Sequence, residues 1–244
     1  AEGIAELSVL HARAAQTPDA LTSHRAAAVL ASCDPRTALL DLLPTGTLGY
    51  AAVRRTEQFR MRGTTAKVHL ALSKPLPSEQ PFEHARTGEN LDFLERAFDA
   101  VKYRRFSERP SLGIAVTGAP TGHAALSIMV DFAPHHLDGG WNDDARERLG
   151  DAVVAELDRH FPGADDSVVA REVLSPADIE TRYGVTGGHI HHGEHALDQL
   201  VVRPTIDAAR YRTPVPGLYL CGGGSHPGGG VTCAPGFLAA QAVE

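Results

Sequence analysis

The stretch from Pro216 to Gly236 has residue types and a spacing that could hold a flat or anionic ligand. Its glycine runs, Gly222–Gly224 and Gly228–Gly230, remove side chains where a ligand or a second backbone comes close. Pro235 fits the first turn of a helix, and the free N–H groups of such a helix start suit a phosphate or an electron-rich carbonyl. Turns of this kind also occur in many unrelated folds, so a purely structural turn is an equally good interpretation.

A second group of candidate residues is the histidine-rich stretch that contains His189, His191, His192, Glu194 and His195. Neutral imidazoles two residues apart on a strand point the same way and could bind Zn²⁺ or another borderline metal. The spacing departs from the H-x-H-x-D-H element of metallo-β-lactamase-type hydrolases, because the acid is a glutamate and lies one residue too far along. A metal-dependent hydrolase is therefore kept as an alternative, and our leading prediction assigns no metal ligand.

Strands and helices that could position these residues follow from hydrophobic periodicity. Val68, Leu70 and Leu72 alternate with more polar residues, which indicates a half-exposed antiparallel strand. Leu149, Val153 and Leu157 repeat every four residues, and Asn142 can cap the helix that carries them. Strands are predicted at Arg25–Cys33, Phe59–Leu72, Ser111–Val116, Ala124–Phe132, Val168–Leu174 and Leu218–Cys221, with a turn at 118–122. Helices are predicted at Glu89–Tyr103 (Leu91, Leu94, Phe98 and Val101 on its apolar side), at Asp143–Phe161, from Ser175-Pro176, and at Thr232–Val243.

Composition bounds the class of protein. The chain has 244 residues, 43% of them hydrophobic and 22% charged, which predicts a soluble globular protein with a sizeable core. A formal net charge of −7 without a basic stripe argues against a nucleic-acid partner. Cys33, Cys221 and Cys233 are odd in number and widely spaced, so neither a disulfide framework nor a C-x-x-C pair is expected. With no transmembrane run or signal-peptide pattern, we expect a cytoplasmic or organellar-matrix location.

The motifs resemble those of a known family. Leu218–Gly224, followed by His226–Thr232, is similar to the closing motif of FAD-dependent oxidoreductases in the phytoene desaturase and amine oxidase superfamily. The likeness is greatest to the phytoene desaturase-like branch labelled pyridine nucleotide-disulfide oxidoreductase domain-containing proteins. Ala31–Thr37, Ala66–Leu72 and Gly187–Glu194 occur in the order expected for that branch, so the resemblance spans nearly the whole chain.

The resemblance implies a cofactor, a reaction and site residues. FAD would accept a hydride from a small, apolar substrate, and the helix after the final glycine turn would face the flavin. Lys67 would be catalytic, because its strand is similar to the amine-oxidase strand whose lysine holds a water at flavin N5. His191 would be catalytic as part of a segment that passes the flavin and substrate cavity. The cofactor-binding residues would be Gly222, Gly223, Gly224, Gly229, Gly230, Val231 and Thr232.

The sequence also departs from the family pattern. It has no G-x-G-x-x-G turn for the FAD diphosphate, and residues 26–35 already match the middle of the pattern. Gly224 stands where many members place an acidic residue that contacts the cofactor. The resemblance therefore implies the C-terminal portion of a flavoenzyme, from a split gene or a truncated protein.

The expected fold class is α/β (α+β). An antiparallel substrate-domain sheet with helices (45–183) would lie between pieces of a partial FAD-binding domain (1–44 and 184–244) that lacks its N-terminal βαβ unit. We expect weak FAD binding by the chain alone, and self-association or a partner that supplies the missing half. A non-catalytic fragment that assembles with such a partner is the remaining alternative.

Overall fold

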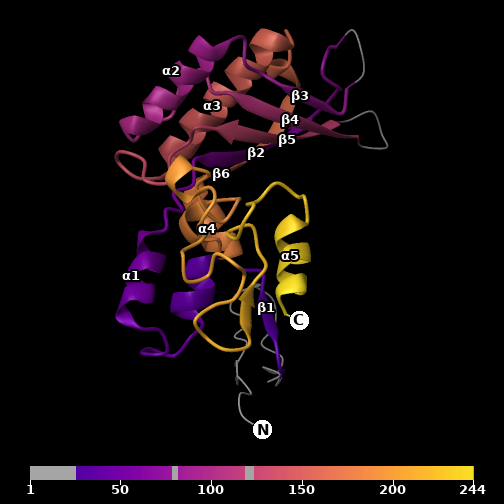
Figure 1. Ribbon diagram of the computed structural model, residues 1–244. Helices are drawn as coiled ribbons and strands as arrows, with labels where there is room; N and C mark the ends of the chain where they lie inside the picture. Colours follow the sequence, from indigo (N-terminus) through magenta and orange to yellow (C-terminus); the bar gives the residue numbers. More distant parts are fainter. Residues whose placement is uncertain (1–25, 79–81, 119–123, 244) are drawn as a thin grey trace, which may run out of the picture. The chain divides into compact units, whose positions relative to one another are not determined.

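The computed structural model describes residues 26–78, 82–118 and 124–243, which form two compact units (Figure 1). Within those ranges, unit 1 comprises residues 26–62 and 183–243, and unit 2 comprises residues 63–182. Residues 45–62 thus group with unit 1, whereas the sequence-based division places them with the middle portion.

Unit 2 is built on a five-stranded antiparallel sheet with the strand order β3-β4-β5-β2-β6. Its strands are β2 (Thr65–Leu72), β3 (His84–Arg86), β4 (Leu112–Gly118), β5 (Ala124–Asp131) and β6 (Val168–Leu174). The predicted alternation along β2 is confirmed, because Val68, Leu70 and Leu72 are buried between more exposed neighbours. The predicted antiparallel sheet is therefore present. The turn predicted at 118–122 falls mainly on residues outside the described ranges.

Helices α2 (Leu91–Lys102) and α3 (Asp143–His160) lie over the same face of this sheet (Figure 1). The predicted core residues of α3, Leu149, Val153 and Leu157, are fully buried against the sheet. The short helix predicted from Ser175-Pro176 is α4 (Pro176–Tyr183).

The predicted apolar side of α2 is wrong in part. Leu91 is 81% exposed, and Ala97 is the buried residue of the helix. Phe98 is 43% exposed and meets the Phe132 ring edge-on, with the ring centroids 5.5 Å apart. The buried side of α2 is therefore centred on Ala97 rather than on Leu91 and Phe98.

Unit 1 contains two parallel strands, β1 (Val29–Ala31) and β7 (Leu218–Leu220), with Val29 opposite Leu218. Helix α5 (Ala234–Ala242) follows β7, and helix α1 (Tyr50–Gln58) follows β1 after a π-helical turn. Leu39, Leu43, Leu48, Leu218 and Leu220 form much of the core. The strand predicted to start at Arg25 is described only from residue 26 onward. Helix α1 and strand β3 were not predicted.

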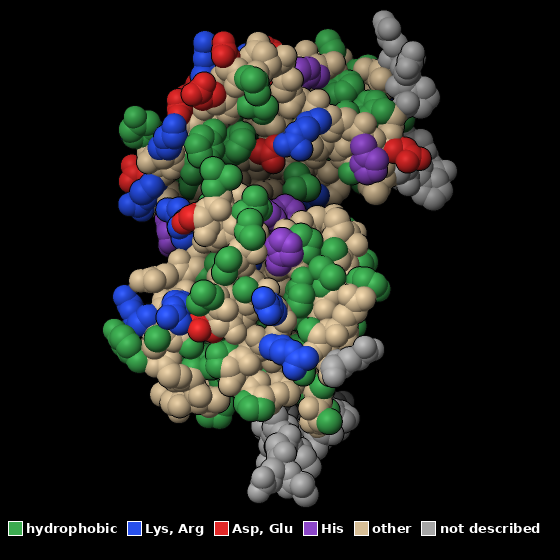
Figure 2. Space-filling model, in the orientation of Figure 1, with side chains coloured by type: hydrophobic (Ala, Val, Ile, Leu, Met, Phe, Trp, Pro, Cys, Tyr) green, Lys and Arg blue, Asp and Glu red, His purple; other side chains and the backbone are tan. Residues whose placement is uncertain are grey.

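The surface of unit 1 carries an apolar area at its C-terminal helix. In Figure 2, hydrophobic side chains gather over α5 and the turn before it, where Val231 is 100% and Phe237 is 65% exposed. None of the helices in the described ranges combines the length and the apolar character needed to cross a bilayer.

Candidate functional site

The glycine-rich turn leaves β7 beside the end of β1, at the edge where both parallel strands end. The Cys221 N–H donates a hydrogen bond to the Ala31 carbonyl over 2.9 Å, which holds the two strand ends together. A Cβ on Gly222 would lie 2.9 Å from the carbonyl carbon of Ser32 and 3.1 Å from the Cys33 carbonyl oxygen. A side chain at position 222 would therefore collide with the chain's own backbone. In open sheets with parallel strands, this edge is also where ligands bind.

Most of the remaining glycines pack against the histidine-rich loop. A Cβ on Gly223 would lie 3.2 Å from the His191 carbonyl oxygen, and one on Gly229 would lie 2.9 Å from His191 Nδ1. A Cβ on Gly224 would lie 2.9 Å from the His192 carbonyl oxygen. The absence of side chains at these positions lets the turn and the loop touch. At these positions the chain itself comes within reach of an added Cβ.

The segment Gly230–Cys233 differs, because its backbone is open. Gly230 has φ +136°, and a Cβ there would meet nothing closer than Thr232 Cγ2 at 4.0 Å. Val231 has φ +59°, an uncommon conformation for a β-branched residue, and it is fully exposed. Cys233 has φ +58° and precedes α5, which begins at Ala234 rather than at the predicted Thr232 and has Pro235 in its first turn as predicted. A ligand can approach this strained, exposed backbone without displacing protein atoms.

His189 is held neutral inside the histidine-rich loop. Its Nδ1 accepts hydrogen bonds from the His191 N–H at 3.3 Å and the Gly193 N–H at 3.4 Å. Burial, followed by the proximity of His191, lowers the pKa of His189 to about 4. A lone pair on Nδ1 is needed for both hydrogen bonds, so the proton of the neutral ring is on Nε2.

The histidine-rich loop brings three imidazole rings near one another. The ring centroids of His191 and His195 lie 5.5 Å apart, and those of His189 and His191 lie 6.2 Å apart. In the described ranges, no three His, Cys, Asp or Glu side chains are placed to hold one metal ion. The alternative of a metal-dependent hydrolase is not supported.

Three buried polar atoms on the turn and the loop lack a hydrogen-bond partner. Among the described residues, these are His192 Nδ1, Ser225 Oγ and His226 Nδ1. Such atoms are uncommon in native structures and indicate strain, an internal water or a nearby ligand. This part of unit 1 therefore contains buried polar atoms whose hydrogen-bonding capacity is unused.

Arg203, which the sequence analysis did not single out, lies at the centre of this arrangement. Its side chain is fully buried and donates hydrogen bonds to backbone carbonyls of both the loop and the glycine turn. The Val-Val-Arg-Pro context gives no signal of burial, because an arginine before a proline is as compatible with an exposed loop.

Lys67 belongs to unit 2, whereas His191 and all the predicted cofactor-binding residues belong to unit 1. Lys67 is half-buried on β2, opposite Met129 and Leu174 of the flanking strands. The same alternation that buries Val68 against α3 places Lys67 on the other face of the sheet. Burial lowers the pKa of the Lys67 amine.

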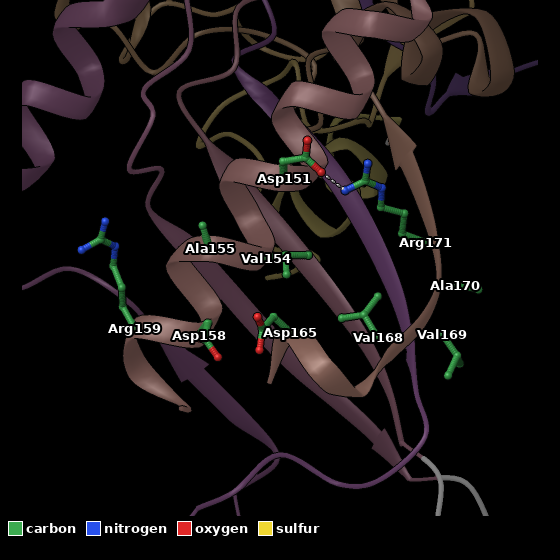
Figure 3. A pocket seen from close by; sticks show the side chains of 10 residues that line it. All are labelled: Asp151, Val154, Ala155, Asp158, Arg159, Asp165, Val168, Val169, Ala170 and Arg171. Carbon is green, nitrogen blue, oxygen red and sulfur yellow. Dashed lines mark hydrogen bonds and ion pairs between the residues drawn. The ribbon is translucent and has the colours of Figure 1, made fainter. Parts of the chain in front are cut away.

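Unit 2 also has a groove of about 710 Å³ between α3 and the edge strand β6 (Figure 3). Its charged groups bind one another or the backbone: Asp151 pairs with Arg171 over 2.5 Å, and Asp158 accepts hydrogen bonds from the Gly163 and Ala164 N–H groups. Figure 3 shows the Asp151–Arg171 pair bridging the helix and the strand. The charged side chains of this groove are therefore already paired.

Comparison with known proteins agrees with the family that the motifs resemble. No protein-family model matches the chain. The chain is 34% identical over 241 residues to pyridine nucleotide-disulfide oxidoreductase domain-containing protein 2 of Rattus norvegicus, and the Mus musculus protein of that name is equally similar. These alignments cover 90% of the chain and 42% of each relative, so the chain spans less than half of their length.

Two further relatives, named as a dehydrogenase and a desaturase, match a shorter part of the chain. A limonene dehydrogenase component of Castellaniella defragrans is 31% identical over 49% of the chain and 22% of that protein. Carotenoid 3,4-desaturase of Haloarcula japonica is 31% identical over 46% of the chain and 22% of that protein. Over 90% of its length the chain is therefore similar to part of a pyridine nucleotide-disulfide oxidoreductase domain-containing protein, and about half of it is similar to parts of a dehydrogenase and a desaturase, which confirms the resemblance predicted from the motifs.

Proposed function

We propose that the chain is part of an FAD-dependent dehydrogenase or desaturase, and that the segment from Gly222 to Thr232 and the start of α5 contact the flavin. The observation that carries the proposal is the open backbone at Gly230–Thr232, between a buried parallel strand and a helix start. The residues fit a flat cofactor, since an added Cβ at Gly230 would stand in empty space that a ring can fill. The similarity to oxidoreductases over 90% of the chain supports the same assignment.

When bound, the flavin would accept a hydride from the substrate. The first turn of α5 lies at the positive end of the helix dipole, which stabilises negative charge on an adjacent group. The Thr232 hydroxyl accepts a hydrogen bond from the Ala234 N–H at 3.3 Å. His191, which touches Gly223 and Gly229, would border the substrate.

Lys67 has the chemistry of a water-holding group. Burial lowers the pKa of its amine, so the amine gives up its proton more readily than that of an exposed lysine. We propose that the Lys67 amine holds a water molecule.

For the whole protein, we propose an apolar substrate, since two relatives are named for limonene and for a carotenoid. The chain has no G-x-G-x-x-G turn, so the diphosphate of FAD would be held by a segment that carries this motif. We expect the chain alone to bind FAD weakly, and a strand–turn–helix segment with the motif to strengthen binding.

A titration of FAD into the chain, followed by visible absorbance, tests the proposal. Gly230→Val should abolish flavin binding, measured with the motif-bearing segment present. Gly46→Val is the matched control, because Gly46 also has positive φ (+88°) and no atom within 4 Å of an added Cβ. Equal loss in both variants, or no loss in either, would contradict a contact at Gly230. Absence of flavin with and without the segment would favour the non-catalytic fragment.

A further inference from the structure

Arg203 uses its whole guanidinium group to join separate segments of unit 1. It is 0% exposed. Its Nη1 group donates to the Glu194 carbonyl at 2.9 Å, its Nη2 group to the Gly193 carbonyl at 3.2 Å, and its Nε–H to the Gly224 carbonyl at 3.3 Å. Longer contacts of 3.5 Å reach the carbonyls of Gln199 and Gly223. The five N–H donors of the group thus each have a carbonyl acceptor.

The partners of Arg203 are backbone atoms rather than carboxylates. The carboxylate of Glu194 is turned toward other groups, Arg60 at 3.1 Å and Arg62 at 2.9 Å. The guanidinium also lies over the Phe59 ring, 5.5 Å from its centroid. A buried charge is costly unless hydrogen bonds compensate it, so these carbonyls must stay in place while the side chain is inside.

The carbonyls that Arg203 binds belong to the two surfaces that meet at the candidate site. Gly193 and Glu194 are part of the histidine-rich loop, and Gly223 and Gly224 are part of the glycine-rich turn. The same two surfaces touch directly where His191 meets Gly223 and Gly229. The rigid, planar guanidinium of Arg203 donates hydrogen bonds to both segments and therefore sets the distance between the turn and the loop.

We propose that Arg203 is a positioning residue for this site: its guanidinium holds the turn at Gly223–Gly224 against the loop at Gly193–Glu194, and so fixes where His191 lies relative to Gly229. Its importance for a cofactor rests on the function proposed above. The hydrogen bonds of Arg203 to the turn and the loop lie within unit 1 and are testable without a flavin.

The charge of Arg203 acts on the same loop. The pKa of His195 is lowered by burial first and then by the charges of Arg203 and His191. The groups that face His195 include Gly228, whose added Cβ would meet the His195 ring, and the ring of His191. Loss of the arginine charge should therefore raise the pKa of His195 even where the loop keeps its shape.

The test compares Arg203→Lys and Arg203→Met with Arg212→Met by amide hydrogen exchange and NMR titration of the histidines. Arg212 is a matched control, because it also lies over an aromatic ring, that of Tyr219 at 5.7 Å, but is exposed. Both Arg203 variants should exchange about tenfold faster at residues 222–226, while unit 2 and the Arg212 variant stay as in the parent chain. The pKa of His195 should rise in Arg203→Met and stay low in Arg203→Lys.

Normal protection at residues 222–226 in Arg203→Lys would overturn the proposal, because a lysine lacks the planar guanidinium. If the variants do not fold, the parent chain decides: its Arg203 Nε–H should exchange far more slowly than that of Arg212, and equal rates would overturn the proposal. FAD titration is read separately. If exchange changes as expected but FAD does not bind even with the motif-bearing segment present, the positioning role of Arg203 stands and the proposed flavin site is contradicted.

Discussion

Single residues in the loop of unit 1 are held in one protonation state and one conformation by the backbone around them. His189 accepts two backbone N–H bonds through Nδ1, so protonation there removes both. Its pKa is about 4 in the folded protein, against 6.5 for an unperturbed histidine. Between these values, the unfolded chain binds a proton that the folded chain does not.

The free energy of unfolding of unit 1 should therefore fall as the pH falls from about 6.5 to about 4, by up to about 1.4 kcal/mol per pH unit from this group. Above pH 6.5 the contribution is fully present. His189→Gln should flatten the pH dependence, since glutamine does not titrate. Urea unfolding followed at several pH values measures the slope, and an unchanged slope in the variant would assign the effect to another group.

Gly229 and Gly230 should respond differently to the smallest substitution. In Gly229→Ala, the new Cβ would lie 2.9 Å from His191 Nδ1 and 3.0 Å from His191 Cβ, so the histidine must shift. In Gly230→Ala, the space is open and the expected cost is backbone strain of roughly 1 kcal/mol. NMR shifts of the His191 ring should change markedly in Gly229→Ala alone. If both variants move His191 equally, the close packing at Gly229 is wrong.

The glycine pattern predicted the turn, but the sequence could not predict which atoms lie against its glycines. The spacing of Gly222–Gly224 and Gly228–Gly230 indicates close approach without saying whether a ligand or the chain approaches. Arg203 was missed because its burial depends on carbonyls from the loop, from Gln199 and from the turn, which meet only in the folded chain.

At the level of elements, helix α3 shows how a cap and a core face together fix one helix on a sheet. Asn142 accepts a hydrogen bond from the Ala145 N–H at 2.8 Å, and Leu149, Val153 and Leu157 are fully buried. Asp178 of α4 receives two hydrogen bonds from Arg146 of α3, at 2.6 and 2.9 Å, and others from Ser175. These contacts join α3 to α4.

Asn142→Ala should lower the stability of unit 2 by about 1 kcal/mol, because an N-terminal N–H loses its partner. Asn90→Ala is the companion variant: Asn90 caps α2 in the same way, through Phe93 N–H at 2.9 Å, but α2 buries less of its surface. The effect of Asn90→Ala on global unfolding should be smaller, with the loss confined to fraying of α2 in hydrogen exchange. A larger global loss from Asn90→Ala would reverse this ranking.

Elements with strong periodicity could be predicted, and short or weakly patterned ones could not. Strand β2 and helix α3 bury one face each, which leaves a clear alternation or four-residue repeat. Helix α1 buries only Thr56, and β3 has three residues, so neither leaves a pattern. Phe98, on the exposed side of α2, shows that an apolar side chain can pack against a ring at the end of a strand instead of entering the core.

For the whole molecule, the division into two units predicts where a ligand acts. FAD that binds the turn in unit 1 should stabilise that unit by about 2.7 kcal/mol at a hundredfold excess over the dissociation constant. Hydrogen exchange should slow at residues 218–236 and remain unchanged in β2, β4 and β5. Equal protection of both units would contradict a site confined to the turn.

Apolar area at the surface bears on the expected self-association. Val231 and Phe237 are exposed beside the glycine-rich turn. Such side chains favour contact with another surface. We expect light scattering to show species larger than a monomer at high concentration, and Val231→Ser with Phe237→Ser to reduce them. A clean monomer for the parent chain would contradict this expectation.

The order of segments along the chain has a consequence for how the protein can be assembled. Unit 1 is made of two stretches that unit 2 separates, so its strands β1 and β7 pair across more than 180 residues. Unit 2 opens with β2 and has β6 near its end, and these neighbours pair with Lys67 opposite Leu174. Its entry and exit strands thus lie side by side, as in an inserted domain. Such an insertion can fold during synthesis before the last stretch emerges, and it can in principle be replaced by a short linker while β1 and β7 still meet.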